Sequence, residues 1–538
     1  MPERTARDLP PEPSLEVPPW VLARHGARVL DPVTALRRPG EDAPRSTIYL
    51  QNRLVGQGHE ASQRAAMPLK RAVRGLGLSM RAVATGTSPR SLISKARQAG
   101  AAEDVSLDNL GQHCWHFELD TDRPSRPADA WHALQAFRTD AGEDVDVGAV
   151  ALDHLVGLTM PGIGGSPFTQ SHGVGGAPFT QSHSADSAIG SYAVAGSGGR
   201  APVQWLGDEP TRKYNGRRPV VAILDTGIGK HEWLKDENVI RAPRLFGTRI
   251  GLPPARSGVT GVSDPLTGLI DPDAGHGTFI AGLIRQTAPD AMLLDIPVFG
   301  GDGVVAESVL LAALQRLVIW HQLGVAGVPG YQPIDVVSLS LGYYHEHPLD
   351  LNYDALLKAP LEALVRSGVL VVVSAGNDAT SRPMYPAAFS MTTPPDALPV
   401  ISVGALNPDS TTALFSNDGE WVSTRRAGAA LVSTYPVTMQ AAANPAVSVK
   451  TVGGRVRASI DPDSFVSGFA TWSGTSFAAP VLAGQLAAHL AAQYHAGEAA
   501  LDPSAAMIRA RTAIAAVVTD LGPVAKAPTG KSAGEKAS

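Results

Sequence analysis

Three short motifs place an acid, an imidazole and a hydroxyl at the ends of predicted elements. Asp225 follows the apolar run Val220–Leu224 and precedes a turn that contains glycine. His276 stands between two glycines at the start of an apolar helix, and Ser476 opens another apolar helix within the sequence GTSFAAP. A helix N-terminus favours negative charge that develops beside it. Each residue alone has an ordinary explanation: a turn aspartate, a surface histidine or a serine N-cap.

Taken together, the three residues fit nucleophilic hydrolysis. The acid, the base and the hydroxyl occur in the order Asp, His, Ser within one α/β region. In such a triad the imidazole takes the hydroxyl proton, and the carboxylate orients the ring and stabilises the imidazolium. A recognition module that binds its ligand without turnover is the alternative. Covalent labelling of Ser476 by a fluorophosphonate would separate the two interpretations.

The elements that must position these residues alternate along the chain from about residue 217. Short apolar runs predict buried strands, and the stretches between them have helical spacing. The expected strands are 220–224, 336–341, 369–373 and 400–403, and the expected helices are 304–323, 353–367 and 476–493. This alternation predicts a mostly parallel sheet covered by helices on both faces.

Residues 217–520 resemble the subtilisin-like serine proteases, the subtilases. The three motifs read VVAILDTGIG, GHGTFIAG and GTSFAAP, and their Asp, His, Ser order is that of subtilisin. The motifs VVSLSLG, VVVSAGND, Tyr385-Pro386, VISVGA and ALFSNDG follow in the family's order. The resemblance implies a subtilisin-like α/β domain and a serine endopeptidase that hydrolyses peptide bonds through an acyl-enzyme.

The resemblance also implies the residues that hold the substrate. Asn377 would supply the side-chain amide that stabilises the oxyanion, together with the backbone N–H of Ser476. The walls of the primary specificity pocket would be formed by Ser340, Leu341 and Gly342 on one side, and by Ser374, Ala375 and Gly376 on the other. At the base of the pocket the family often has glycine, and this chain has Met384. Its long thioether predicts a preference for small apolar residues before the scissile bond.

Departures from the family pattern concern the surroundings of the triad. Phe477 follows the nucleophile where methionine is common. The 51-residue step from Asp225 to His276 contains a Gly- and Pro-rich insertion, in which Asp264, Asp271 and Asp273 could bind calcium. The chemistry itself requires no cofactor. A second insertion, Val437–Asp463, predicts an extra hairpin.

The first 155 residues predict a smaller α+β domain, with a strand at 113–119 and a helix at 128–137. Between Glu60 and Glu103 there are eight bases and no acid, whereas Glu103 to Asp153 holds twelve acids and three bases. Because few aromatics are interleaved with the bases, we interpret them as a solvated helix face and not as a nucleic-acid site. The domain is either propeptide-like, docking on the peptidase domain, or a module that binds a partner.

Residues 156–199 contain eleven glycines and neither Lys nor Arg. They include a repeat, GSPFTQSH at 165–172 and GAPFTQSH at 176–183. This composition predicts a mobile linker that is cut by the enzyme itself or by another protease, with a passive tether as the alternative. The expected organisation is therefore an N-terminal domain (1–155), a linker (156–210), a peptidase domain (211–521) and a disordered tail (522–538).

Composition narrows the class of protein. A single cysteine, Cys114, excludes an internal disulfide framework and a multi-cysteine metal site. A net charge of -5 argues against a dedicated nucleic-acid binder. The N-terminus has no apolar signal region, and no run of about 18 apolar residues predicts a membrane span. We expect a cytoplasmic protein that acts on proteins or peptides, with export by an unconventional route left open.

Overall fold

The computed structural model describes residues 15, 17–56, 59–84, 89–101, 110, 115–121, 127–142, 144–158, 192, 199–253, 256–259, 268–347 and 355–519. Most of the predicted linker (159–191 and 193–198) and the C-terminal tail lie outside this set. Asp264 and Cys114 also lie outside it.

A seven-stranded sheet forms the centre of the larger unit, in the order β16-β15-β14-β13-β7-β11-β8. All neighbouring strands in it are parallel. Its strands are β7 (Val220–Asp225), β8 (Val239–Ile240), β11 (Met292–Pro297), β13 (Val336–Leu339), β14 (Leu370–Ser374), β15 (Val400–Leu406) and β16 (Thr424–Ala427). The central strands are continuous runs of buried Val, Ile and Leu, as expected for strands covered on both faces. The predicted parallel sheet is confirmed.

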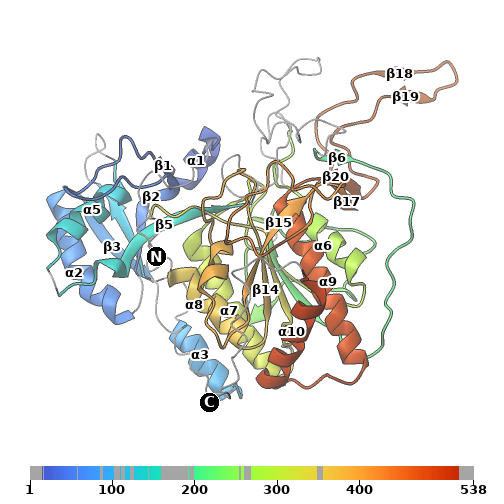
Figure 1. The fold of residues 1–538 in the computed structure, drawn as a ribbon. Helices are drawn as coiled ribbons and strands as arrows, with labels where there is room; N and C mark the ends of the chain where they lie inside the picture. The colour runs from blue at the N-terminus through green and yellow to red at the C-terminus, as the bar shows by residue number, and fades with distance from the viewer. Residues whose placement is uncertain are drawn as a thin grey trace, which may run out of the picture.

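Two groups of helices lie on opposite sides of β14 in Figure 1. They are α7 (Glu307–Val325) and α8 (Ala355–Arg366) on one side, and α6 (His276–Thr287), α9 (Thr475–His495) and α10 (Pro503–Val517) on the other. By length and composition α7 could cross a membrane, but 72% of its apolar window is buried inside the fold, as in a core helix.

The start of α7 differs from the prediction of a helix over 304–323. Residues Val304–Ala306 form a strand, β12, and the helix begins at Glu307. The reason is tertiary: β12 pairs antiparallel with β5 (Val150–Gly157), in the register Val304↔Gly157. A strand far away in the sequence therefore overrides the local helical pattern.

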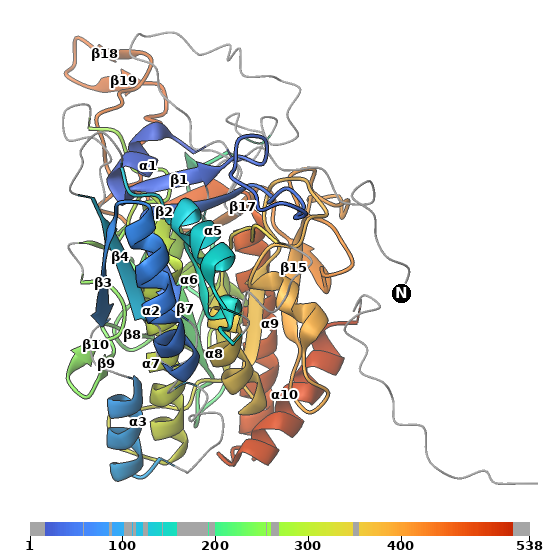
Figure 2. The same ribbon diagram turned by 90° about the vertical axis from the view of Figure 1, so that its left-hand side faces the viewer.

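The N-terminal part is an antiparallel sheet covered by helices, which confirms the predicted α+β class. Its strand order is β12-β5-β2-β4-β3, with β1 beside β2. The strands are β1 (Ala27–Leu30), β2 (Thr47–Gly56), β3 (Ser79–Ala84) and β4 (Trp115–Asp120), and the helices are α1 (Pro19–His25), α2 (His59–Gly75), α3 (Pro89–Gln98) and α5 (Ala130–Asp140). Helices α2 and α5 pack on each other and on this sheet, whereas α3 packs on α7. Figure 2 shows the molecule from the side on which this part lies in Figure 1.

Smaller sheets complete the molecule. One contains β17 (Leu431–Thr434), β20 (Phe469–Trp472) and β6 (Ala201–Pro202), and another contains β9 (Arg244–Leu245) and β10 (Thr248–Arg249). The predicted extra hairpin is present as β18 (Ser448–Lys450) and β19 (Val456–Ala458), which project from the body in Figure 1.

Candidate active site

The acid and the imidazole of the predicted triad meet between the central strand and the first helix of the larger unit. Asp225 is the last residue of β7, which lies between β13 and β11, and His276 is the first residue of α6. Nδ1 of His276 lies 2.9 Å and 3.0 Å from the two carboxylate oxygens of Asp225. Because a carboxylate only accepts, Nδ1 carries the donated proton, and Nε2 of the neutral ring keeps its lone pair.

Close packing requires the glycines around His276, whose ring is fully buried. A Cβ on Gly277 would lie 2.7 Å from the carbonyl oxygen of Gly227 and 3.0 Å from Oδ1 of Asp225. Gly275 has φ +82°, and a Cβ there would lie 2.6 Å from the ring of Tyr435. A side chain at Gly277 would therefore crowd the acid, and one at Gly275 would collide with Tyr435.

Ser476 lies in the first turn of α9, and its carbonyl oxygen accepts a 2.7 Å hydrogen bond from the hydroxyl of Ser340. Its own Oγ and the Nε2 of His276 are both buried without a hydrogen-bond partner among the described residues. The ring of Phe477 packs on the imidazole of His276, with centroids 5.1 Å apart. Phe477 therefore supports the ring of His276.

Asn377 follows β14 and reaches the start of α9. Its Oδ1 accepts hydrogen bonds of 2.9 Å from both the backbone N–H and the hydroxyl of Thr475. The hydroxyl oxygen of Thr475 in turn accepts a 3.0 Å hydrogen bond from the backbone N–H of Gly376. These contacts fix the orientation of the amide, and its Nδ2 is left buried without a partner among the described residues. An unpaired amide donor next to the first turn of α9 is the feature that an oxyanion site needs.

The two predicted pocket walls follow neighbouring parallel strands. Ser340–Gly342 come after β13, and Ser374–Gly376 include the end of β14 and the residues after it. Met384 is fully buried between them. A Cβ on Gly342 would lie 2.4 Å from Cε of Met384, and one on Gly376 would lie 2.7 Å from its Sδ. The thioether therefore touches both walls.

The end of β5 continues along the first of these walls. The backbones of Gly157 and Gly342 exchange two hydrogen bonds, of 3.0 Å and 3.1 Å. The next residue, Leu158, donates a 2.8 Å hydrogen bond to the carbonyl oxygen of Gly303. An extended segment from the N-terminal part thus lies between Gly342 and Gly303. The sequence did not place it there, because nothing local to Gly157 marks it as the partner of a residue so far along the chain.

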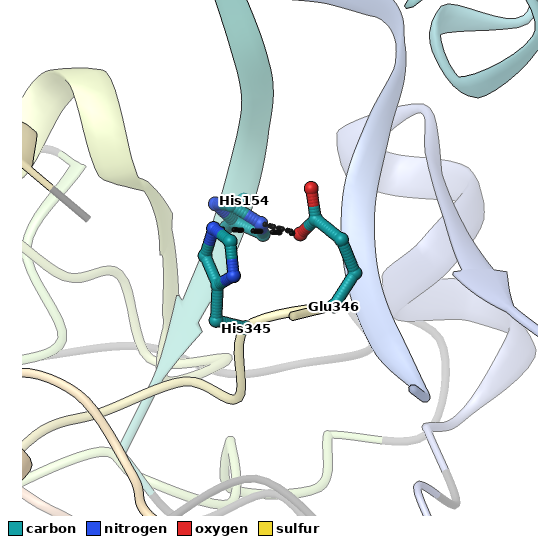
Figure 3. A group of neighbouring side chains, drawn as sticks. All are labelled: His154, His345 and Glu346. Carbon is teal, nitrogen blue, oxygen red and sulfur yellow. Dashed lines mark hydrogen bonds and ion pairs between the residues drawn. The ribbon is translucent and has the colours of Figure 1, made fainter. Parts of the chain in front are cut away.

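A buried charged cluster lies close to that segment and was not found in the sequence. His154 of β5 has Nδ1 2.8 Å from Oε2 of Glu307 and Nε2 2.8 Å from Oε2 of Glu346, and Figure 3 shows His345 beside them. Tyr343 donates a 2.9 Å hydrogen bond to the other oxygen of Glu307. Burial alone would lower the pKa of His154, but the charges and hydrogen bonds of the two glutamates raise it well above its ordinary value.

The same cluster is the group of side chains in the described residues most suited to a metal ion, since ligand atoms of His154, His345 and Glu346 lie within 4.8 Å of one another. The hydrogen bonds favour a proton instead. Both ring nitrogens of His154 face carboxylates. Nδ1 of His345 accepts a 3.0 Å hydrogen bond from the backbone N–H of His347, so in the neutral ring Nε2 bears the hydrogen. Burial lowers the pKa of His345 to about 3, which keeps that ring neutral.

Two of the three aspartates suggested for calcium are described, and both are buried. Asp271 and Asp273 face the glycine turn before β12: a Cβ on Gly301 would lie 2.3 Å from Asp271, and one on Gly303 would lie 1.9 Å from Asp273. Burial raises the pKa of Asp273 well above its ordinary value. Calcium binding stays a prediction.

Comparisons with known proteins place the chain in a family. The model of the subtilase family (peptidase S8) matches residues 216–527. An intracellular serine protease of Paenibacillus polymyxa is 29% identical over 308 residues, which cover 54% of this chain and 69% of that protein. The major intracellular serine protease of Bacillus subtilis is 28% identical over 252 residues, covering 44% and 65%. The solved structure of a cold-adapted subtilisin-like serine proteinase is 18% identical with a TM-score of 0.33, and covers 57% of this chain and 86% of that one.

The family match spans more than half of the 538 residues. It includes every motif on which the sequence resemblance was based. The chain therefore belongs to the subtilase family and is a subtilisin-like serine peptidase.

Proposed function

We propose that this serine protease is an endopeptidase whose catalytic residues are Asp225, His276 and Ser476. The observation that carries the proposal is the imidazole of His276, held at Nδ1 by Asp225 with a bare Nε2. A base of this kind can accept the proton of Ser476 as its oxygen attacks a peptide carbonyl. His276 then gives the proton to the leaving amine, and water hydrolyses the acyl-enzyme by the same route in reverse.

The proposal assigns the oxyanion to the Nδ2 of Asn377 and the backbone N–H of Ser476. Charge develops on the carbonyl oxygen only as the tetrahedral intermediate forms. A donor fixed in advance stabilises that state more than the substrate. The two hydrogen bonds that hold Oδ1 of Asn377 support this role, because they leave its amide donor in a constant place.

We further propose that the N-terminal part is propeptide-like and that the enzyme cuts its own linker. Gly157 and Leu158 already lie extended against Gly342 and Gly303, as a substrate strand would. Because Gly157 and Leu158 take the place of a substrate strand in this proposal, we expect the scissile bond within a few residues after Leu158. The alternative, a module that binds another partner, predicts an intact chain and salt-sensitive binding through the basic helices.

We also propose a cytoplasmic location for the protein. Two relatives, from P. polymyxa and B. subtilis, are named intracellular serine proteases, which supports it.

The deciding experiment compares the wild-type chain with Ser476→Ala, each purified and incubated separately. Mass spectrometry and N-terminal sequencing would report new ends, and a fluorophosphonate probe would report an activated serine. We expect labelling and cleavage after residue 158 in the wild type alone. A wild-type chain that hydrolyses peptides yet stays intact would rule out self-processing. Absence of both labelling and hydrolysis would favour the recognition module without turnover, a pseudoprotease.

A further inference from the structure

The loop that carries Asn377 needs support on both sides if its amide is to stay in place. We define the oxyanion loop as Ala375–Thr380, which directly follows β14. Gly376 in this loop has φ +100°, a conformation that glycine adopts without strain. Thr475 holds the side chain of Asn377, but that contact does not fix the backbone of the residues after it.

A second asparagine, Asn417, makes the missing contacts. Its Oδ1 accepts hydrogen bonds from the backbone N–H groups of Asp378, at 2.9 Å, and Thr380, at 3.2 Å. The Nδ2 of Asn417 donates a 3.0 Å hydrogen bond to the carbonyl oxygen of Ala375. The backbone N–H of Asn417 donates a 2.9 Å hydrogen bond to the carbonyl oxygen of Gly376. One fully buried residue therefore binds the loop both before and after Asn377.

The same side chain also reaches the opposite wall of the pocket. Nδ2 of Asn417 donates a 2.9 Å hydrogen bond to the hydroxyl of Tyr344, which itself donates to Asp378 at 2.6 Å. Tyr344 lies two residues after Gly342, the end of the first wall. Asn417 thus connects the loop on one wall to the strand extension on the other.

Packing and chemistry both require an asparagine here. A Cβ on Gly376 would lie 2.4 Å from Nδ2 of Asn417, so the amide rests directly on the backbone of the loop. The contacts use two donor hydrogens and two acceptor sites of one short amide. Aspartate would keep the acceptors but turn a second oxygen toward the carbonyl of Ala375.

We infer that Asn417 is a positioning residue of the reaction, which fixes the backbone on both sides of Asn377 and thereby the amide that receives the oxyanion. This inference rests on the proposed role of Asn377. If it holds, loss of Asn417 acts on the transition state through Asn377. A residue that only supported the fold would lower stability without a selective effect on kcat.

The test is a double-mutant cycle in the full chain with Asn417→Ala, Asn377→Ala and the two combined. Removal of one oxyanion donor costs roughly 10²- to 10³-fold in kcat. We expect Asn417→Ala to lose about 10- to 100-fold in kcat, a part of that range, with KM changed less than about threefold. In the Asn377→Ala background the same change should cost less than about threefold, because the donor it positions is gone.

Two further variants keep the result interpretable. Asn417→Asp retains the acceptors for Asp378 and Thr380, and should show a smaller kcat loss than Asn417→Ala; it replaces the alanine variant in the cycle should that one not fold. Asn444→Ala makes the same chemical change at an exposed asparagine and should leave kcat and stability unchanged.

The outcomes separate the inference from the function on which it rests. Full additivity of the two substitutions, or a loss confined to KM, would overturn the positioning role. An Asn377→Ala protein with wild-type kcat would instead refute the proposed oxyanion donor, and the inference with it. An inactive wild-type chain would refute the proposed function itself.

Discussion

At the scale of single residues, the proposed triad depends on glycines that leave space as much as on the side chains that react. Gly277 leaves Oδ1 of Asp225 room to face the imidazole, since a Cβ there would lie only 3.0 Å from that oxygen. The atoms that Gly277 makes room for lie far along the chain, but the glycine stands directly beside His276, and so a short motif records the requirement. Asn417 is different, because it is adjacent to none of the residues that it holds, which lie 37 to 73 residues away along the chain. No pattern around residue 417 reveals which loop its amide holds.

The triad gives the first prediction. Ser476→Ala and His276→Ala should each lower kcat by about 10⁶-fold, the loss known for the same residues of subtilisin, while the protein stays folded. The double variant should lose little more, because the two groups act as one unit. Peptide hydrolysis beside circular dichroism checks this. Substantial activity in Ser476→Ala would contradict the assignment of the nucleophile.

Met384 gives a second prediction at this scale. Its thioether lies between Gly342 and Gly376 and occupies the space between the proposed pocket walls. Met384→Gly should raise the kcat/KM ratio of Phe to Ala before the scissile bond by at least about tenfold. Removing a buried methionine side chain also costs about 2–5 kcal/mol of stability. Profiling on a peptide library decides it, with the substitution Met391→Gly at the surface as the control. A wild type that already prefers Phe or Tyr would contradict the filled pocket.

At the scale of elements, the sequence was most informative where the local pattern alone determines the secondary structure. The strands β7, β13, β14 and β15 and the helices α7, α8 and α9 were predicted because their apolar patterns are continuous. The strands β8, β11 and β16 of the same sheet were not predicted. The strand β12 was missed, since Val304–Ala306 become a strand only beside β5. The cluster around His154 was missed for the same reason: its partners Glu307 and Glu346 lie 153 and 192 residues away.

The cluster around His154 predicts that the stability of the protein depends on pH. Because the pKa of His154 is raised in the folded protein, its stabilising effect is fully present below its unfolded pKa of about 6.5. The effect is lost as the pH rises through the raised value, when the proton between the two carboxylates leaves. The thermal midpoint of Ser476→Ala, which cannot cut itself, should therefore fall between neutral and alkaline pH.

A histidine substitution tests the cause of that fall. His154→Gln should cost about 3–5 kcal/mol at neutral pH, because it leaves two buried carboxylates without their cation. Its thermal midpoint should also change less with alkaline pH. The matched control is His132→Gln, at an exposed position in α5. An unchanged slope in His154→Gln would assign the pH dependence to other groups.

At the scale of the whole molecule, the two sheets form one connected structure. The antiparallel sheet of the N-terminal part ends in β12, which leads directly into α7 of the larger unit. The sequence predicted both parts by composition and charge, but not this joint, which depends on contacts between distant segments. The pairing of β5 with β12 places Gly157 and Leu158 beside the strand extension at Gly342. His276 and Ser476 are both fully buried. We expect a peptide substrate to compete with this segment for the backbone of Gly342.

The last prediction follows from the docked end of β5. Peptide hydrolysis by the full wild-type chain should begin with a lag, because the end of β5 lies where a substrate strand would pair with Gly342. Gly157→Pro removes the N–H that donates to the carbonyl of Gly342, and so weakens the docked strand. Progress curves should show a shorter lag for this variant. Gly453→Pro, in the exposed turn of the β18–β19 hairpin, serves as the control and should keep the wild-type lag. Gels taken along the curves would show whether activity rises together with cleavage after Leu158 or with release of the strand alone. Curves that are linear from the start, with the chain intact, would mean that the docked strand does not compete with substrate, and that the N-terminal part is a binding module and not an inhibitor.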